Sequence, residues 1–317
     1  MKKFLLKTLV FVCLLILILA GTVLFDIFAV GGTFKNNYQA SIVDKLDRLE
    51  SITEPKIILV GHSNVSFGFD SARLEEEMGM PVVNLGLHGS LGNSFHENLA
   101  KVNLREGDIV VVCHTSFSDD GLIGDYSLAW ITVDNNKRIA DLIEKRDYRG
   151  MLEAYPDYLC NSLFLWATGR ANRDTGSCYS RNAFNGYGDI VLRPEDMAVT
   201  EEYFKTASVG VPEITEDCMN RFNEFVREVN DKGASVVIAG YPIAYGEYSD
   251  FTAEDFDDFE QKLRKYAECD VISKYSDYFF PYSYFYNTQL HLTEEGAAVR
   301  TDLLASDLKA WLNYRNK

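Results

Sequence analysis

Residues 56–64 read KIILVGHSN, an apolar run that ends in a glycine and a polar turn. A run of this length bounded by turn residues is typical of a strand buried on both faces of a sheet. Two similar runs follow, PVVNLGL at 81–87 and DIVVVC at 108–113, and helical periodicity lies between them at 71–78 and 93–104. Strands that alternate with helices of this length predict a parallel sheet with helices on both faces.

The same alternation returns near the carboxyl end of the chain. An amphipathic helical pattern at 216–230 leads into the apolar run SVVIAGYP at 235–242. A capping-box pattern starts another helix at 252, a short strand begins near 271, and a closing helix follows 293. We therefore expect an α/β fold, a doubly wound, flavodoxin-like parallel sheet of about five strands.

The alternation stops between 117 and 214. This segment carries helical patterns at 137–144 and 149–159 and a loop rich in Arg, Asn and Gly. It is too long for an ordinary loop, so we expect a helical insertion after the third strand that forms a lid over the site. Its aromatic residues, which suit either core packing or stacking on sugar rings, include Tyr126, Trp130, Trp166, Tyr179 and Tyr187.

The amino terminus has the pattern of a membrane anchor. Residues 8–25 form an apolar run, TLVFVCLLILILAGTVLF, that follows three lysines and is long enough to cross about 30 Å of hydrocarbon. A cleaved signal peptide is the alternative, but the run exceeds the usual length of about 7–15 residues and no A-x-A site follows. We expect a single-pass protein of the cell membrane with a cytoplasmic amino terminus and an extracytoplasmic domain.

These patterns divide the chain into an anchor at 1–30, a juxtamembrane helix or stalk at 31–55, and one large domain at 56–317 that contains the insertion. The formal net charge is −16. An acidic protein repels nucleic acid, so we expect no nucleic-acid partner, and contact with the membrane through the amino-terminal helix.

The six cysteines show no zinc or C-x-x-C spacing, and we expect neither a metal nor another cofactor. Cys13 lies in the predicted anchor. Cys113 lies in an apolar strand and is predicted to be a buried thiol, whereas Cys160 and Cys178 could pair in an oxidising compartment.

Polar side chains follow the predicted strands at the edge where a parallel sheet binds its ligands. Ser63 comes after the first strand, and His291 comes just before the last helix. A serine hydroxyl becomes a nucleophile when a histidine takes its proton, so these two residues are the candidate catalytic pair. Each of them alone also suits a structural role, since serine is favoured at helix starts.

Three more histidines each follow one of the first three strands: His62, His88 and His114. With His291 they should gather around one cleft and bind substrate, because imidazoles hold a carbohydrate by hydrogen bonds and stacking. The alternatives are a plain polar lining or a transition-metal site, for which no nearby carboxylate or cysteine completes a recognised ligand set.

Three blocks in their order resemble the SGNH (GDSL-like) hydrolase superfamily and, within it, membrane-anchored, envelope-associated relatives that include the DltD-like proteins. VGHSNVSFGFDS at 60–71 is similar to the nucleophile block, VVNLGLHGSLG at 82–92 to the second block, and FYNTQLHLTEEGA at 285–297 to the last block. The resemblance covers 56–116 and 235–313, with weaker support from the segment FNGYGD.

The resemblance implies that Ser63 is the nucleophile and His291 the base, while the N–H groups of Ser63 and Gly86 hold the oxyanion. Two positions depart from the family pattern. His114 stands where an oxyanion asparagine is usual, and Asn287 stands near the place of the aspartate that orients the histidine. An asparagine carbonyl orients an imidazole without stabilising imidazolium, so Asn287 predicts reduced activity.

Other residues could fill the two missing roles. Asn64 or Asn84 could donate to the oxyanion, although local turn bonding also suits both. The carboxylates that could replace the missing aspartate are Asp70, Asp119 and Asp120, and a backbone carbonyl could also suffice.

The resemblance and the anchor together predict a serine esterase or O-acyltransferase that acts on an acylated cell-envelope glycopolymer. The alternative is a catalytically impaired domain that binds glycan or serves as an assembly partner of a membrane-bound acyltransferase. A metal-dependent hydrolase is the third alternative.

Overall fold

The computed structural model describes residues 1–118, 121–207 and 210–315. Its centre is a parallel sheet of five strands in the order β2-β1-β3-β4-β6. These strands are β1 (Ile57–Val60), β2 (Val82–Asn84), β3 (Ile109–Val112), β4 (Ser235–Ile238) and β6 (Asp270–Val271). Two short strands form a separate parallel pair, β5 (Ile243–Ala244) and β7 (Phe279–Phe280). The prediction of an α/β fold with a parallel five-stranded sheet is confirmed.

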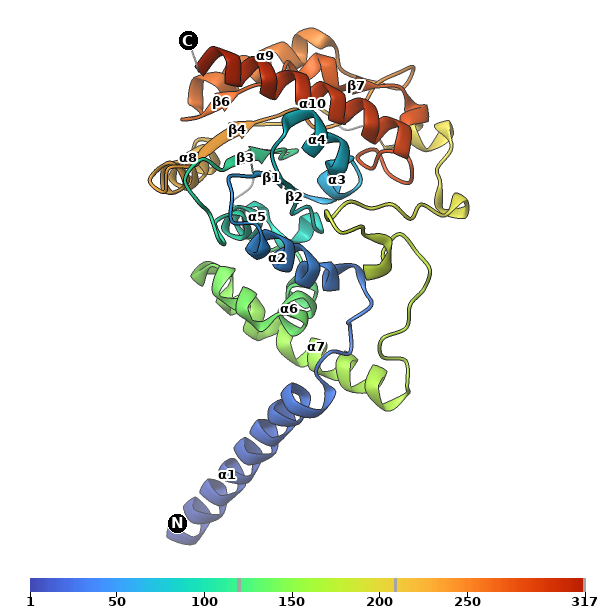
Figure 1. The fold of residues 1–317 in the computed structure, drawn as a ribbon. Helices are drawn as coiled ribbons and strands as arrows, with labels where there is room; N and C mark the ends of the chain where they lie inside the picture. Colours follow the sequence, from blue (N-terminus) through green and yellow to red (C-terminus); the bar gives the residue numbers. More distant parts are fainter. Residues whose placement is uncertain (119–120, 208–209, 316–317) are drawn as a thin grey trace.

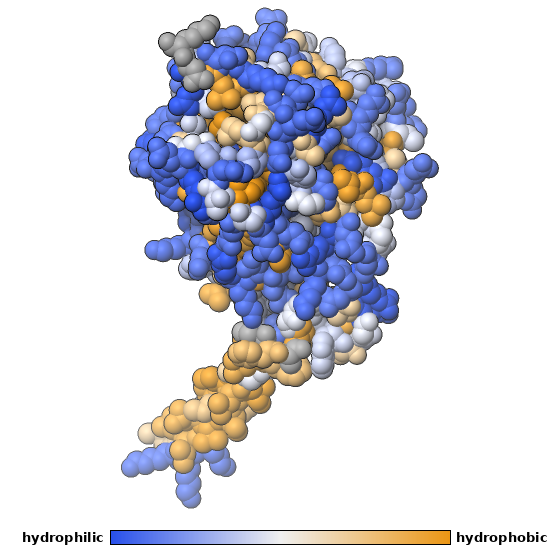
Figure 2. Space-filling model, in the orientation of Figure 1, coloured by the Kyte–Doolittle hydropathy of each residue, from blue (hydrophilic) through white to orange (hydrophobic). Residues whose placement is uncertain are grey.

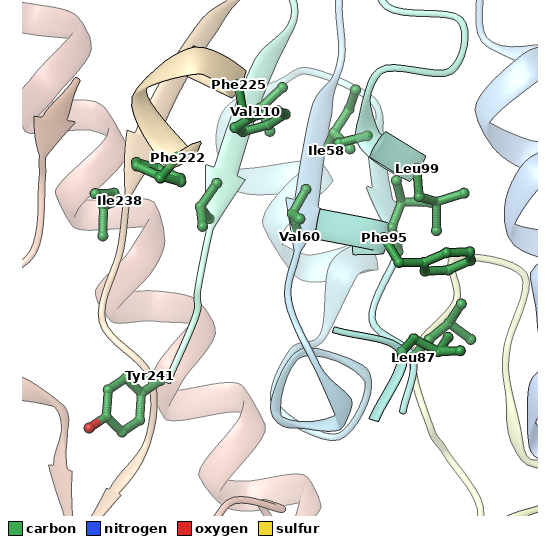
Figure 3. Close-up of a cluster of buried hydrophobic side chains, with 14 of the residues drawn as sticks. Ile58, Val60, Leu87, Phe95, Leu99, Val110, Phe222, Phe225, Ile238 and Tyr241 are labelled. Carbon is green, nitrogen blue, oxygen red and sulfur yellow. The ribbon is translucent and has the colours of Figure 1, made fainter. Parts of the chain in front are cut away.

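Buried residues lie on both faces of the sheet because side chains alternate along each strand. Ile58 and Val60 belong to one cluster, and Ile57 and Leu59 belong to the other. Helices α2 (Ser41–Ser51), α5 (Asn93–Ala100), α8 (Glu216–Asn230) and α9 (Ala253–Tyr266) complete the first cluster, part of which is drawn in Figure 3. Helices α4 (Ser71–Met78) and α10 (Glu294–Arg315) complete the second.

Local capping sets most of the helix boundaries. Helix α4 ends at Gly79, which has the left-handed φ of +64° that favours glycine. Helix α9 begins with the predicted capping box of Thr252 and Asp255, and α8 has the predicted bounds. Three elements end clearly earlier than predicted, since β2 ends at Asn84, α5 ends at Ala100 and β4 ends at Ile238.

The insertion contains two helices that pack on each other, α6 (Tyr126–Asn135) and α7 (Tyr148–Ala167). Helix α7 contains the predicted helix at 149–159, whereas α6 lies where no helix is predicted. The predicted helix at 137–144 is a short 3-10 helix, Lys137–Leu142. Beyond α7, irregular chain with short 3-10 turns runs along the side of the body before α8 (Figure 1).

The amino-terminal helix α1 (Lys2–Phe25) projects from the body and is long and apolar enough to cross a membrane (Figures 1 and 2). A short π-helical turn, Asp26–Val30, connects it to the rest of the chain. The apolar stripe predicted in α2 is buried in the first cluster through Ile42, Leu46 and Leu49. The segment 31–55 is therefore packed against the sheet domain.

The cysteines are only partly as predicted. Cys113 is a buried thiol directly after β3. The disulfide between Cys160 and Cys178 is not formed, because Cys160 is exposed on α7 and Cys178 is buried with its Sγ 3.6 Å from Asn287 Nδ2.

Candidate active site

Ser63 lies where β1 has ended and the short helix α3 (Ser63–Ser66) begins. The turn before it needs a glycine, because a Cβ on Gly61 would lie 2.7 Å from Val65 Cγ2. The Ser63 carbonyl accepts a hydrogen bond from the Phe67 N–H at 2.9 Å. The serine is thus held at the carboxyl end of β1, where it borders a pocket.

His291 is brought to Ser63 by the loop that precedes α10. The His291 carbonyl accepts a hydrogen bond from the Tyr286 N–H (2.7 Å), which closes the loop. The imidazole stacks on the Phe67 ring, with the ring centroids 4.0 Å apart and the planes 6° from parallel. In this position His291 Nε2 lies 2.8 Å from Ser63 Oγ, although the two residues are 228 positions apart.

The other nitrogen of the imidazole faces Asn287. His291 Nδ1 is 2.7 Å from Asn287 Oδ1, and Asn287 Nδ2 donates to the Tyr179 hydroxyl at 3.0 Å. Because Tyr179 takes the amide nitrogen, the amide oxygen accepts from Nδ1–H. This tautomer leaves Nε2 free to accept the proton of Ser63.

The imidazole of His291 is neutral at neutral pH. Burial, followed by the charges of His88 and Arg193, lowers its pKa to about 3. The neutral form is the one that can accept a proton, but so low a pKa makes His291 a weak base. A carboxylate on Nδ1 would oppose this shift, because it stabilises imidazolium.

Of the carboxylates predicted as substitutes, Asp70 does not supply that charge. Within the described ranges no carboxylate is hydrogen-bonded to His291. Asp70 instead caps α4 by accepting from the Arg73 N–H at 3.1 Å. Asp119 and Asp120 lie outside the described residues.

Two of the predicted oxyanion donors are engaged elsewhere. The Gly86 N–H donates to Asn84 Oδ1 at 2.9 Å. Asn64 is fully buried, and its Nδ2 donates to the Cys113 carbonyl at 3.0 Å. In this structure Gly86 and Asn64, predicted as oxyanion donors, are therefore engaged in local hydrogen bonds. The Ser63 N–H has no acceptor within the described chain, so it is the predicted donor that stays open.

The five histidines separate into two positions. His88 is exposed and borders the same pocket as Ser63 and His291. His62 lies 5.8 Å from His114 and 5.1 Å from His96, ring centroid to ring centroid. His62 Nε2 is bonded to the amide oxygen of a neighbouring asparagine at 2.7 Å. His62 and His114 therefore pack with each other and with His96 and are not part of the pocket wall.

His114, predicted to bind substrate, lies outside the pocket that Ser63 and His291 border. Its side chain is 1% exposed, and its Nε2 is 3.1 Å from Glu97 Oε1. Glu97 forms a second buried contact, an ion pair with Arg221 of α8. Among residues 1–118, 121–207 and 210–315, no group of three or more His, Cys, Asp or Glu side chains is arranged to hold a metal ion.

The pocket bordered by Ser63 and His291 has a volume of about 730 Å³. The insertion lines part of it through Leu128, Tyr179 and Tyr203. The Tyr203 hydroxyl donates to Gln289 Oε1 at 2.5 Å, which joins the insertion to the loop that carries His291. The rings and polar groups of this wall suit a substrate with both hydroxyls and apolar faces.

A buried carboxylate organises the turns around the pocket. Asp189 accepts hydrogen bonds from Ser71 Oγ (2.6 Å) and Asn84 Nδ2 (2.7 Å). Lys45 of α2 donates to the Asn84 carbonyl at 2.9 Å. Asp189 lies in the segment FNGYGD, so these bonds tie the insertion to the turn that follows β2.

Arg300 is a buried residue of the site that the sequence analysis missed. It is fully buried on α10, where its Nη1 donates to the Asn64 carbonyl (2.6 Å) and its Nη2 donates to the Gly240 carbonyl (3.1 Å). The guanidinium also lies 4.1 Å from the centre of the Phe69 ring. Arg300 thereby joins the turn of Ser63 to the chain after β4.

Comparison of the chain with protein-family models, with curated proteins and with solved structures finds no match. The function therefore has to be inferred from the residues and the geometry of the site.

Proposed function

We propose that the chain is a membrane-anchored serine esterase or O-acyltransferase of the SGNH type, with a doubly wound extracytoplasmic domain at 56–317 and a lid at 117–214. Its substrate is an acylated glycopolymer of the cell envelope. The observation that carries the proposal is the hydrogen-bonded series Ser63–His291–Asn287, with distances of 2.8 Å and 2.7 Å.

In this mechanism Ser63 Oγ attacks the acyl carbonyl carbon while His291 Nε2 takes the hydroxyl proton. Asn287 holds Nδ1–H, so the imidazole keeps the required tautomer. The open Ser63 N–H donates to the tetrahedral oxyanion. Collapse of the intermediate expels the sugar alcohol, which takes the proton from His291. Water or a second sugar hydroxyl then attacks the acyl-serine, with His291 again acting as the base.

The pocket and the anchor support the substrate class. An O-acylated sugar needs a wide pocket with hydroxyl partners and aromatic faces, and Tyr179, Tyr203 and His88 provide these. A chain tethered by α1 meets polymers near the membrane surface at a higher effective concentration than polymers free in solution.

A second function is favoured by two specific observations. Asn287 lacks the charge that stabilises imidazolium, and the Gly86 N–H is already engaged by Asn84. A catalytically impaired domain that binds glycan, or that assembles with a membrane-bound acyltransferase, would retain the pocket without needing either feature.

Covalent labelling by a fluorophosphonate separates the two functions. If the protein is a serine esterase or acyltransferase, we expect the reagent to modify the full-length protein at Ser63 and not to modify Ser63→Ala. Ser90→Ala is the matched control, because Ser90 lies on the turn after β2 and is not part of the catalytic series. An unlabelled wild-type protein that binds envelope glycan would favour the impaired domain, and a metal found by elemental analysis would favour a metal-dependent hydrolase.

A further inference from the structure

A second cavity lies where the end of α1 meets α6 and α7, the region at the base of the body in Figure 1. Its volume is about 420 Å³. Val23 and Asp26 line it from the end of α1, and residues of α6, the following turn and α7 line the rest. This cavity is separate from the one bordered by Ser63, with which it shares no lining residue.

The position of the cavity corresponds to the headgroup level of a membrane that α1 crosses. Phe25, the last residue of α1, makes an edge-on contact with Trp166 of α7, with ring centroids 5.4 Å apart. Tyr148, Leu152 and Trp166 are 51%, 73% and 46% exposed. Their spacing puts them on one face of α7, and aromatic residues of this kind gather at membrane–water interfaces.

The wall of the cavity is aromatic. The ring centroid of Trp130 lies 4.7 Å from that of Tyr155 and 5.8 Å from that of Tyr158. The Trp130 N–H donates a hydrogen bond to the Met151 carbonyl at 2.7 Å, which fixes the indole in place. Aromatic faces held in this way attract organic cations.

Two carboxylates lie beside these rings. Asp26 is 4% exposed, and its Oδ1 has no hydrogen-bond partner among the described residues. Asp134 is half-buried and accepts the Gly32 N–H at 3.1 Å. Burial and the nearby Asp134 charge raise the pKa of Asp26, so the cavity holds negative charge at a cost that a bound cation would offset.

Lys137 also borders the cavity. It forms no ion pair with either aspartate within the described parts of the chain. Lys35, which does not line the cavity, also acts on Asp134, so groups of both charge signs lie in and beside the cavity. A zwitterionic ligand fits this pattern, with its cation toward the aspartates and its phosphate toward Lys137.

We propose that this cavity binds the ammonium headgroup of a membrane phospholipid. The headgroup nitrogen lies against Asp26, Asp134 and the ring of Trp130, while the acyl chains lie along α1 and the apolar face of α7. The proposal rests on the membrane anchoring proposed above and not on the chemistry of Ser63.

The test uses the full-length protein in mild detergent. Phosphatidylethanolamine and phosphatidylglycerol with the same acyl chains are titrated, and binding is followed by the rise in Tm. We expect phosphatidylethanolamine to bind about tenfold more tightly than phosphatidylglycerol, because only the former carries an ammonium group. Equal affinity for the two lipids would overturn the proposal.

Variants locate the binding to the cavity. Asp26→Asn and Trp130→Phe should each remove most of the preference, whereas Asp157→Asn, an exposed residue of α7, should retain it. Asp26→Asn removes a buried charge that has one unpartnered oxygen, so it should not lower the Tm of the lipid-free protein. A preference that persists in both cavity variants would contradict the proposal.

Two further measurements test whether the rise in Tm comes from a membrane lipid and whether it depends on the reaction of Ser63. Glycerophosphoethanolamine carries the same headgroup without acyl chains, and a response equal to that of the lipid would overturn a membrane source. Fluorophosphonate labelling of Ser63 is measured on the same samples. The lipid preference is expected whether or not Ser63 reacts. The two measurements therefore distinguish failure of the esterase proposal from failure of the lipid-binding proposal.

Discussion

Two histidines at the same end of the sheet differ in what their ring nitrogens face. His291 lies between a serine hydroxyl and a neutral amide, and it borders the pocket. His114 is bonded to the Glu97 carboxylate, which is also paired with Arg221, and it is buried. The comparison teaches that a carboxylate beside a histidine does not by itself mark a catalytic base. Access to a hydroxyl and to the pocket is the property that separates the two residues.

Removing each imidazole should give the largest difference between the two histidines, measured as the rate of fluorophosphonate labelling at Ser63. His291→Gln takes away the base, and we expect the rate of fluorophosphonate labelling at Ser63 to fall about 10³-fold. His114→Gln is the matched variant and should leave this rate nearly unchanged, because His114 does not touch the pocket. Equal losses in the two variants would contradict the distinction.

The carboxylate beside His114 should matter for stability. Glu97→Gln leaves the partly buried Arg221 without its charge partner, and we expect the free energy of unfolding to fall by about 3 kcal/mol. Chemical denaturation of the full chain in detergent measures this loss. Glu268→Gln breaks an exposed ion pair with Arg227 and should cost less than about 1 kcal/mol.

A carboxylate beside His291 would give it the kind of charged neighbour that His114 already has in Glu97. Asn287→Asp places a carboxylate on Nδ1 and raises the pKa of His291, and the Tyr179 hydroxyl can turn to donate to it. We expect the labelling rate to rise about 10- to 100-fold, less than the factor of about 10⁴ that separates aspartate from asparagine in serine proteases. Asn287→Ala should be slower than wild type, and an aspartate variant no faster than wild type would show that charge is not the missing element.

Acid should destabilise the protein through histidines that are buried as neutral rings. The pKa of His62 is lowered from 6.5 to about 4, and that of His291 to about 3, with burial as the main cause. Between pH 6.5 and these values the unfolded chain takes up protons that the folded chain refuses. The stability that these two histidines contribute is therefore complete above pH 6.5 and falls as the pH falls, by about 1.4 kcal/mol per pH unit for each histidine. His62→Gln should flatten the dependence measured from pH 7 to pH 5, and an unchanged slope would contradict this origin.

The parts of the fold that the sequence predicts are those with local signals. Helix α8 has its predicted bounds because its apolar residues recur with helical spacing, and α9 starts at its capping box. Helix α6 gives no such signal, since apolar residues occur on all its sides and only packing against α7 explains it. Strand β2 ends early because the Asn84 side chain takes the Gly86 N–H, a bond that no periodicity reveals.

The residues of the candidate site also divide into those with a signal in the sequence and those without one. Ser63, His291 and Asn287 were found because they follow predicted elements in a recognisable order, and the structure brings all three together. Which N–H groups stay open depends on turns that form only in the folded chain, so the sequence does not reveal that Gly86 and Asn64 donate to local acceptors. Arg300 did leave a signal, because it lies one turn before Leu304 on the apolar stripe of α10, where a charged residue is unexpected.

Arg300 and His291 both lie near the carboxyl end of the chain, whereas Ser63, whose hydroxyl and turn they contact, lies near the start of the domain. A chain interrupted before its last residues would carry Ser63 without the His291 imidazole and without the Arg300 guanidinium that is bonded to its turn. Long-range contacts of this kind form late in folding. The contacts around the Ser63 hydroxyl are therefore complete only when the last helix has folded onto the sheet.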